Sequence, residues 1–295
     1  MSRGKSPLKF IPPQVPTLID EPPEGSQWIH EVKHDGYRTQ LVLDGGEARA
    51  FTRNGHNWTS RYSAITGAAA ALACRSAIID GEVVVQDGRG VSDFEALQKA
   101  LSTGRGRLVF YGFDLLHLDG EDLRNQPLLE RRSKLARLLG ADDKSLVQFS
   151  QEFVGDAAAF FGVCAQHGLE GIVSKYASSR YRSGRSKTWL KTKCFTESEL
   201  TLVGIDRDRK TGAERALLAR QEAEGLVYAG AAFLTLGGEG REALSAKAKE
   251  LAQERPILPW MRGRKARWVR PEVILKVKHL AGARRLRHAT VKAVC

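Results

Sequence analysis

Short runs of apolar and β-branched residues that end at glycine turns recur along the chain and favour a fold rich in β-structure. The segment TQLVLDGGEARAFTRNG predicts two strands joined by a hairpin turn at residues 44–46. SAIIDGEVVVQDGRG predicts another strand pair that breaks at Asp80-Gly81, and RLVFYGFDLLHLDG predicts an apolar, aromatic strand. Residues 1–25, which are rich in proline, predict an extended lead-in with little regular structure.

Amphipathic or apolar segments between the strands predict helices. DFEALQKAL, LLERRSKLARLLG and DAAAFFGVCAQHG have this pattern; the second is strongly basic, and the third is expected to stop at Gly168. EGIVSKY and TWLKTKC predict two further strands. After about Phe195 the pattern changes to short strands between glycine-rich turns, interrupted by the helix GREALSAKAKELAQE. About five strands and one helix in roughly a hundred residues are typical of a small β-barrel such as an OB-fold.

The charge balance favours a polyanionic partner. The chain has 46 Lys and Arg against 34 Asp and Glu, a formal net charge of +12, which points to nucleic acid and, less strongly, to an anionic membrane surface. The arginine-rich segments RYRSGRSK, RGRKARWVR and GARRLRH lie in expected loops, where they could neutralise backbone phosphates. Trp260 and Trp268 lie among them, with barrel core as the alternative interpretation for either.

The cysteines and the hydropathy of the chain indicate in which cellular compartment the protein is expected. The four cysteines are scattered and form no Cys-x-x-Cys pair, so they predict reduced thiols and neither a disulfide framework nor a zinc site. No apolar run approaches the about 20 residues needed to span a bilayer, and the N-terminal residues lack the apolar core of a signal peptide. A cytoplasmic protein without membrane association is therefore expected.

The stretch WIHEVKHDGYR places Lys33 at the end of an expected strand, directly before a turn at residues 34–36. A lysine in this place is held by a rigid element and can face a cleft as a nucleophile; an ordinary solvated strand-edge lysine is the alternative. An amine is a nucleophile only when it is unprotonated, and the lysine reference pKa of about 10.4 is lowered by nearby cations. Lys191 and Lys193 alternate along an expected strand, so both can face one pocket.

Lys33 opens a Lys-x-Asp-Gly-x-Arg pattern, and further motifs follow it in order. They are Arg38 at the end of that pattern, Arg53 in FTRNG, Glu82 in IDGEVVV, Phe113-Asp114 in FYGFDLLHLDG, Glu170 in LEGIVSK, and Lys191 and Lys193 in WLKTKC. With these motifs the chain resembles the covalent nucleotidyltransferase superfamily and, closely, the ATP-dependent DNA ligases. The resemblance is greatest to the ligase module of bacterial ligase D and to related short stand-alone bacterial ligases. It runs from about Leu18 to the end of the chain and is densest up to Phe195.

The resemblance implies an α+β fold in two domains. Residues 1–195 would form an adenylation (nucleotidyltransferase) domain with antiparallel sheets and flanking helices, and residues 196–295 an OB-fold domain. ATP and either Mg²⁺ or Mn²⁺ are the implied cofactors. Nicked or broken double-stranded DNA is the implied substrate, a Ku-like end-binding protein is a candidate partner, and a monomer associated with the nucleoid is expected.

The resemblance also implies roles for the motif residues. Lys33 would attack the α-phosphate of ATP and become lysyl-AMP, while Lys191 and Lys193 would hold that phosphate and stabilise the transition state. Glu170 would bind the metal, and Glu82 the ribose or the metal. Arg38 and Arg53 would bind the nucleotide or the 5′-phosphate end of the nick. Phe113 would stack on adenine, with a core aromatic as the alternative, and Glu31 would contact adenine. His30 and His34 match no role and are interpreted as ordinary polar residues.

The function predicted in this way is that of an ATP-dependent DNA ligase, which seals nicks through lysyl-AMP and a 5′-adenylated DNA in repair or end joining. Two alternatives remain open. An RNA ligase or capping-type nucleotidyltransferase would use the same lysine, and a non-catalytic DNA-binding module could keep the same fold.

Overall fold

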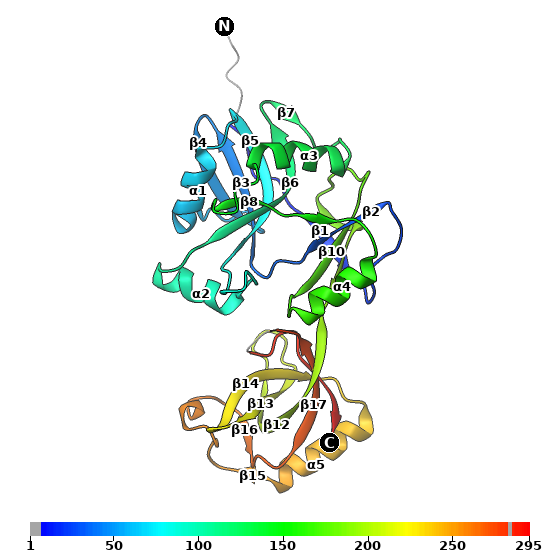
Figure 1. The fold of residues 1–295 in the computed structure, drawn as a ribbon. Coiled ribbons are helices and arrows are strands. Elements are labelled where there is room, and N and C mark those ends of the chain that lie inside the picture. The colour runs from blue at the N-terminus through cyan, green and yellow to red at the C-terminus, as the bar shows by residue number, and fades with distance from the viewer. Residues whose placement is uncertain (1–6, 283–284) are drawn as a thin grey trace. The chain divides into compact units, whose positions relative to one another are not determined.

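The computed structural model describes residues 7–282 and 285–295 of the chain. This part divides into two compact units, Met1–Lys193 and Cys194–Cys295 (Figure 1). Residues 283–284, which belong to the expected basic segment GARRLRH, and residues 1–6 of the expected lead-in lie outside the described residues. None of the helices in the described ranges is both long and apolar enough to cross a membrane.

One sheet of the first unit has the strand order β4-β3-β5-β6-β7, with β8 paired in parallel to β6. Its strands are β3 (Tyr37–Asp44), β4 (Glu47–Thr52), β5 (Ser76–Val84), β6 (Val109–Leu118), β7 (Glu121–Asp122) and β8 (Val147–Phe149). The predicted hairpin joins β3 and β4. Gly45 and Gly46 occupy its turn with φ of 62° and 83°, a backbone region that glycine adopts without steric penalty.

The predicted break at Asp80-Gly81 is wrong, because β5 runs through it without interruption. Gly81 lies where β6 approaches closely. A Cβ at this position would lie 2.2 Å from the Phe110 ring and 2.5 Å from the Tyr111 carbonyl oxygen. The β5–β6 ladder shifts register between Asp80 and Gly81. The glycine therefore serves close strand packing and not a turn.

Two expected helices, α2 (Phe94–Thr103) and α3 (Leu128–Leu139), lie beside this sheet. A further helix, α1 (Ser63–Ala70), follows the 3-10 turn η1 (Thr59–Tyr62). Asp93 caps α2 by accepting a hydrogen bond from the Ala96 backbone N–H at 2.9 Å. Side chains of α1, α2 and α3 join strand residues such as Leu41 and Phe110 in one buried apolar cluster.

The other sheet of the first unit has the order β1-β11-β10-β2-β9. Its strands are β1 (Gln14–Leu18), β2 (Trp28–Val32), β9 (Glu152–Phe153), β10 (Gly171–Tyr176) and β11 (Gly184–Lys193), and α4 (Ala157–Gln166) contacts β10. β10 and β11 were predicted, but β1 was not, since it lies in the expected lead-in. Gln14 anchors β1: its backbone N–H donates to the Tyr181 hydroxyl at 2.9 Å, and its side-chain oxygen accepts from the Arg182 N–H at 2.7 Å.

The sheets of the first unit are mixed, whereas the resemblance implied antiparallel sheets there. β1 runs parallel to β11, β8 to β6 and, in the second unit, β14 to β18. The first two parallel pairs involve β1 and β8, two strands that the sequence patterns did not reveal.

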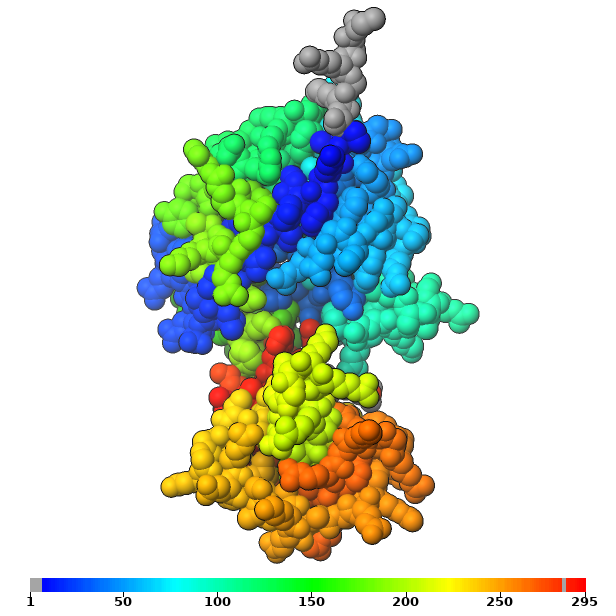
Figure 2. Space-filling view, turned by 180° about the vertical axis from the view of Figure 1, so that it is seen from behind, coloured from blue at the N-terminus to red at the C-terminus, as the bar shows by residue number. Residues whose placement is uncertain are grey.

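The second unit contains a sheet with the order β13-β14-β18-β17-β12-β16-β15 and an added pairing of β13 with β12. Its elements are β12 (Phe195–Arg207), β13 (Glu214–Glu222), β14 (Gly225–Leu234), α5 (Gly238–Glu250), β15 (Ala252–Gln253), the 3-10 turn η2 (Pro259–Met261), β16 (Arg267–Val269), β17 (Ile274–Leu280) and β18 (Thr290–Val294). Figure 2 shows β12–β13 in yellow-green beside the orange segment that follows α5. Leu202, Leu218 and Leu244 lie in its apolar core.

Gly171 supports a stability prediction, because this residue starts β10 with φ of +147° and a Cβ there would lie 2.1 Å from the Thr192 carbonyl oxygen. We expect Gly171→Ala to lower the free energy of unfolding by about 2 kcal/mol or more, since neither the backbone conformation nor the neighbouring strand accommodates a side chain. Thermal melting checks this. Gly162→Ala is the control: it lies inside α4, where an added Cβ would have no neighbouring atom within 4 Å, and should raise stability by about 0.5–1 kcal/mol. Equal melting temperatures for the two variants would show that Gly171 is not required for the close packing of β10 against β11.

Candidate active site

Lys33 lies directly after β2, and the backbone holds it against the neighbouring strand. Its N–H donates to the Gly171 carbonyl oxygen at 2.9 Å, at the start of β10. The residue before Gly171, Glu170, forms an ion pair with the Lys33 amine through one carboxylate oxygen and with the Lys193 amine, at 3.1 Å, through the other. Burial alone would raise the pKa of Glu170, but Lys33 and Lys193 outweigh that effect and lower it. A single carboxylate thus joins two of the predicted catalytic lysines.

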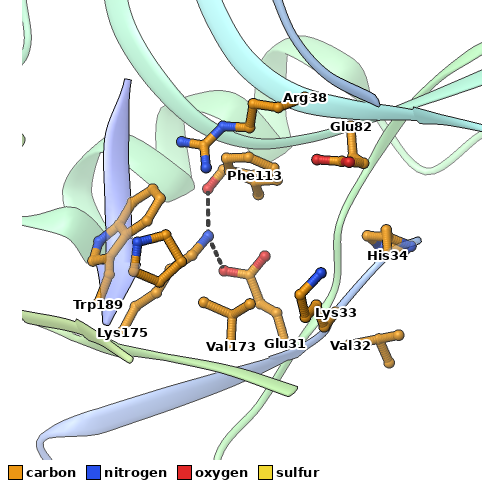
Figure 3. Close-up of a pocket in the computed structure, with 11 residues that line it drawn as sticks. Glu31, Val32, Lys33, His34, Arg38, Glu82, Phe113, Val173, Lys175 and Trp189 are labelled. Atoms are coloured by element: carbon orange, nitrogen blue, oxygen red, sulfur yellow. Dashed lines mark hydrogen bonds and ion pairs between the residues drawn. The ribbon is translucent and has the colours of Figure 1, made fainter. Parts of the chain in front are cut away.

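Five of the predicted site residues line one pocket in the first unit (Figure 3). The residues that line it are Pro16, Glu31, Val32, Lys33, His34, Arg38, Glu82, Phe113, Val173, Lys175 and Trp189. Both sheets contribute: β2, β10 and β11 supply one group, and β3, β5 and β6 supply the other. The pocket therefore combines a lysine amine, carboxylates and aromatic rings from segments far apart in the sequence.

Glu82 lies on β5 and faces the pocket that contains Lys33. Burial raises its pKa to about 7, with Glu170 and Asp80 adding to the rise and Lys33 and Arg38 opposing it. Glu82 and Glu170 are thus close enough to repel each other, and their hard oxygen donors suit Mg²⁺ or Mn²⁺. Among the described residues no group of three or more His, Cys, Asp or Glu could hold a metal ion. A divalent ion held here would therefore also need phosphate or water oxygens.

Phe113 lies on β6 and combines the two roles considered for it. It packs with Leu116 and Trp189 in a buried cluster, yet its ring also lines the pocket. The Lys175 amine lies 4.3 Å from the centroid of the Phe113 ring and 4.4 Å from that of Trp189, and the Arg38 guanidinium carbon lies 4.7 Å from the Phe113 centroid. These are cation–π contacts, which surround an aromatic wall with positive charge.

Glu31 is held by two cations that the sequence analysis did not select. Its Oε1 accepts from Arg132 Nη1 at 2.9 Å and pairs with Lys175 Nζ at 2.5 Å, and all three side chains are almost fully buried. Arg132 also donates to the Phe113 and Ser150 carbonyl oxygens at 3.0 and 2.7 Å. This guanidinium therefore fixes both the predicted adenine contact and the backbone that carries the predicted stacking ring.

A sequence pattern could have predicted the position of Lys175 but not that of Arg132. Lys175 follows Val173 at an alternate position of β10, and both line the pocket, so the two-residue period of a strand was a usable signal. Burial lowers its pKa to about 8; Arg132 lowers it further, and Glu31 opposes both effects. Arg132 lies in a helix interpreted as basic and amphipathic, and no pattern distinguishes a buried arginine there from a solvated one.

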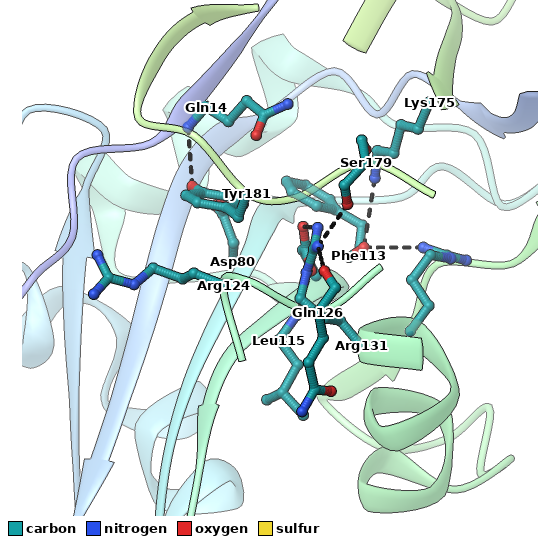
Figure 4. Close-up of polar contacts among 12 residues, drawn as sticks. Gln14, Asp80, Phe113, Leu115, Arg124, Gln126, Arg131, Lys175, Ser179 and Tyr181 are labelled. Carbon is teal, nitrogen blue, oxygen red and sulfur yellow. Dashed lines mark hydrogen bonds and ion pairs between the residues drawn. The ribbon is translucent and has the colours of Figure 1, made fainter. Parts of the chain in front are cut away.

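Arg131, the neighbour of Arg132 on α3, has a structural role (Figure 4). It donates to both carboxylate oxygens of Asp114 at 2.8 and 2.7 Å, and to the Gln126 and Ser179 carbonyl oxygens at 2.7 and 2.9 Å. The side chains of this pair are fully buried. Because Asp114 follows Phe113, the pair also holds the strand that carries the aromatic wall.

Arg38 is held in place by Asp80. Its Nε and Nη2 donate to the two Asp80 oxygens at 2.8 and 2.7 Å, and Nη2 also donates to the Gln14 carbonyl oxygen at 3.0 Å. The Tyr181 hydroxyl donates to the same carboxylate at 2.6 Å. Arg38 thus forms a rigid wall of the pocket, and its predicted contact with nucleotide or phosphate stays a prediction.

The remaining predicted cations lie outside the residues that line the pocket. Lys191 and Lys193 are on β11, and Lys193 reaches the site through Glu170. Burial lowers the pKa of Lys191, and the charges of Lys193, Lys33 and Arg53 lower it further. Arg53 follows β4 and is exposed, so the structure brings its charge near Lys191 but does not place it in the pocket wall.

His34 was interpreted as an ordinary polar residue, but the structure places it in the pocket wall. Its ring stacks on Tyr111 with centroids 4.4 Å apart and an interplanar angle of 9°, and its Nε2 lies 3.3 Å from the Ser150 hydroxyl. Burial lowers the pKa of His34 to about 4, and the charges of Lys33 and Lys175 contribute. The imidazole is therefore neutral in the folded protein near pH 7.

This histidine predicts a pH-dependent loss of stability. Its pKa is lower in the folded chain than in the unfolded chain, so the stabilisation present above about pH 6.5 is lost as the pH falls from 6.5 towards 4. His34→Phe keeps an aromatic ring against Tyr111 and removes the titration. Between pH 7.5 and 4.5, urea unfolding should show wild type losing about 2 kcal/mol more than the variant. Parallel losses in the two proteins would disprove this role.

The pocket, built from two mixed sheets and lined with a lysine, carboxylates and cations, is the kind of site expected in an enzyme class that handles nucleotide phosphates. Residues 14–193, well over half of the chain, match the family model described as ATP dependent DNA ligase domain. The chain belongs to this family. The predicted resemblance to the ligase module of ligase D is also confirmed.

Similar proteins support this placement. The multifunctional non-homologous end joining protein LigD of Pseudomonas aeruginosa is 36% identical over 294 residues, which cover 94% of this chain and 34% of that protein. LigD of Mycolicibacterium smegmatis is 31% identical over 269 residues, covering 87% of this chain and 34% of that protein. The solved structure of mycobacterial DNA ligase D complexed with ATP and MES has a TM-score of 0.58 and 27% identity, covering 96% of this chain and 94% of that chain. The chain thus spans about a third of the length of these curated relatives.

Proposed function

We propose that this chain is an ATP-dependent DNA ligase that seals nicks through a lysyl-AMP intermediate and a 5′-adenylated DNA, in DNA repair by end joining. The observation that carries the proposal is the position of Lys33. Its amine pairs with Glu170 and lines the pocket that also contains Glu82, Arg38 and Phe113. Membership in the ligase family gives that geometry its chemical interpretation.

In the first step the unprotonated Lys33 amine attacks the α-phosphorus of ATP, a nitrogen–phosphorus bond forms, and pyrophosphate leaves. Lys193, paired with Glu170, and the neighbouring Lys191 supply positive charge for the phosphate oxygens. Glu82 and Glu170 would hold Mg²⁺ or Mn²⁺ together with phosphate oxygens. When bound, such an ion neutralises phosphate charge, as in other phosphoryl transfers.

Recognition of adenine is assigned to Phe113 and Glu31. The Phe113 ring would stack on the base, and the Glu31 carboxylate would accept a hydrogen bond from the exocyclic amine of adenine. Guanine carries a carbonyl oxygen at the equivalent ring position, and a carboxylate repels it. Arg132 and Lys175 hold Glu31 in place, so this contact favours ATP over GTP and favours a ligase over a capping enzyme.

In the later steps AMP passes from Lys33 to the 5′-phosphate of a nick, and the 3′-hydroxyl then displaces AMP. Each step is an in-line displacement at phosphorus that depends on positioning and charge neutralisation. Arg38 and Arg53 would contribute to binding the nucleotide or the 5′-phosphate end. The net charge of +12 suits nicked or broken duplex DNA. A monomer near the nucleoid, recruited by a Ku-like protein, completes the proposal.

We also propose that residues 1–195 form the adenylation domain and residues 196–295 an OB-fold domain. The ring of pairings β12-β13-β14-β18-β17 and back to β12 supports a small barrel. The compact units Met1–Lys193 and Cys194–Cys295 support a boundary near the proposed one.

Lys33→Ala should abolish formation of the enzyme–AMP adduct, because it removes the amine that forms the bond to phosphorus. Incubation with α-labelled ATP, followed by denaturing electrophoresis and intact mass spectrometry, measures the adduct. Lys33→Arg, which keeps the charge, should also remain unlabelled. Lys187→Ala removes an exposed lysine on β11 and should be labelled like wild type. Labelling of the Lys33→Ala protein by ATP would disprove the assignment of Lys33 as the nucleophile. Labelling by GTP but not ATP would favour the capping-type alternative, and sealing of nicked RNA alone would favour an RNA ligase.

Glu170→Gln should lower the rate of nick sealing by about 100-fold or more, since it removes the carboxylate that positions Lys33 and that would hold the metal. Binding of nicked DNA should persist, because Glu170 is not part of a basic surface. Sealing assays over a Mg²⁺ titration and gel-shift binding measure the two effects. Glu222→Gln, an exposed carboxylate on β13, is the control. If both variants seal at the wild-type rate, Glu170 does not belong to the site. If the wild-type protein binds nicked DNA but does not seal it, the alternative of a non-catalytic DNA-binding module gains support.

A further inference from the structure

Trp260 of the second unit is an exposed aromatic residue in a defined setting. It lies on η2 (Pro259–Met261), and 65% of the residue is exposed, whereas Trp268 in the same basic segment is buried. The Trp260 ring meets the Tyr228 ring at 77° with centroids 5.5 Å apart. An edge-to-face contact of this kind covers at most one face of the indole, so at least one face is open for stacking.

A chain of polar contacts fixes this aromatic pair to the sheet. Arg264 donates through Nη1 to the Tyr228 hydroxyl at 3.1 Å and through Nε and Nη2 to Asp206 Oδ2 at 3.0 and 2.7 Å. Asp206 lies on β12, is only 8% exposed, and also accepts two hydrogen bonds from Arg215, both at 3.0 Å. The indole is therefore presented by a braced structure and not by an unsupported loop.

Trp260 lines an open hollow whose walls are mainly cationic. The basic residues that line it are Arg207, Arg209, Lys210, Arg215, Arg264, Lys265 and Arg267. Its three carboxylates are engaged by arginines: Asp206 and Asp208 with Arg215, and Glu214 with Arg267. Within the described ranges Arg209, Lys210 and Lys265 are exposed and make no ion pair, which leaves the hollow with excess positive charge.

An open indole face among solvated cations matches one ligand chemistry in particular. Unpaired bases stack on aromatic rings while their phosphates contact Lys and Arg. Duplex DNA keeps its bases stacked on each other and offers this ring no free base face. A folded protein partner would match a patch whose centre is apolar and poor in charged residues, whereas this hollow is lined mainly by cations. We propose that this hollow binds single-stranded DNA, with a base stacked on Trp260 and the adjoining phosphates on Arg209, Lys210 and Lys265.

The choice of DNA over RNA as the ligand rests on the proposed function. The assignment of the hollow as a single-strand binding site does not depend on that function. An unpaired stretch is what a broken duplex end with an overhang presents. The hollow would therefore bind overhanging ends in addition to the nick that the first unit acts on.

The test compares single-stranded and duplex binding by the full chain. Fluorescence anisotropy with labelled oligo(dT) and with a blunt-ended duplex of two annealed strands gives both dissociation constants at one salt concentration. Trp260→Ala should weaken oligo(dT) binding about tenfold or more and leave duplex binding within about twofold of wild type. Trp260→Phe, which keeps a stacking ring, should retain most of the affinity. Ile257→Ala removes an exposed apolar side chain of the same segment, one that does not line the hollow, and should change neither constant.

Two further readouts separate stacking from charge. Oligo(dT) should quench tryptophan emission in wild type and much less in Trp260→Phe. A Lys210→Ala, Lys265→Ala double variant should reduce the salt dependence of oligo(dT) binding. If Trp260→Ala weakens both ligands equally, or neither, the proposal is overturned. Labelling of Lys33 by ATP should be unaffected by Trp260→Ala. Failure of that labelling in wild type would overturn the ligase assignment but leave the binding result standing.

Discussion

The walls of the candidate active site depend on one buried guanidinium, that of Arg132. It donates to Glu31 on β2, to the Phe113 carbonyl oxygen on β6 and to the Ser150 carbonyl oxygen, and it also pairs with Glu152 on β9. These partners belong to both sheets of the first unit, so one side chain ties the sheets together beside the pocket. A buried charge is tolerated only when most of its hydrogen-bonding groups have partners. Removing one partner leaves the other charge buried and unpaired. The spacing of the pocket walls is therefore coupled to the stability of the whole unit.

Near Lys33, two carboxylates have different environments. Glu82 and Glu170 face the same lysine, yet burial raises the pKa of one to about 7 while two ion pairs lower that of the other. Glu170 is thus the permanent anion between Lys33 and Lys193, whereas Glu82 changes charge near neutral pH. Groups whose pKa values are pushed apart in this way are typical of sites that carry out acid–base or phosphate chemistry.

The sequence predicted most elements with a strong local signal, such as the hairpin turn at residues 44–46, the helix α2, and the alternating strand that carries Lys191 and Lys193. It also predicted a group of residues of which five do line one pocket. It missed features decided by distant partners. β1 forms because Tyr181 and Arg182 satisfy Gln14, and β5 continues through Gly81 because β6 packs closely there. Arg132 gave no signal, since burial of a helical arginine depends on what the rest of the fold brings to it.

The hydrogen bond from the Lys33 N–H to the Gly171 carbonyl oxygen extends the pairing of β2 with β10. Glu170 is the residue just before Gly171. The distance between the Lys33 amine and the Glu170 carboxylate therefore depends on this one backbone hydrogen bond between β2 and β10. Sliding one strand past the other by one residue would turn each side chain to the opposite face. The contact between the Lys33 amine and the Glu170 carboxylate is therefore either present in full or lost. An insertion or deletion of one residue in either strand would separate the two groups even if the domain still folded.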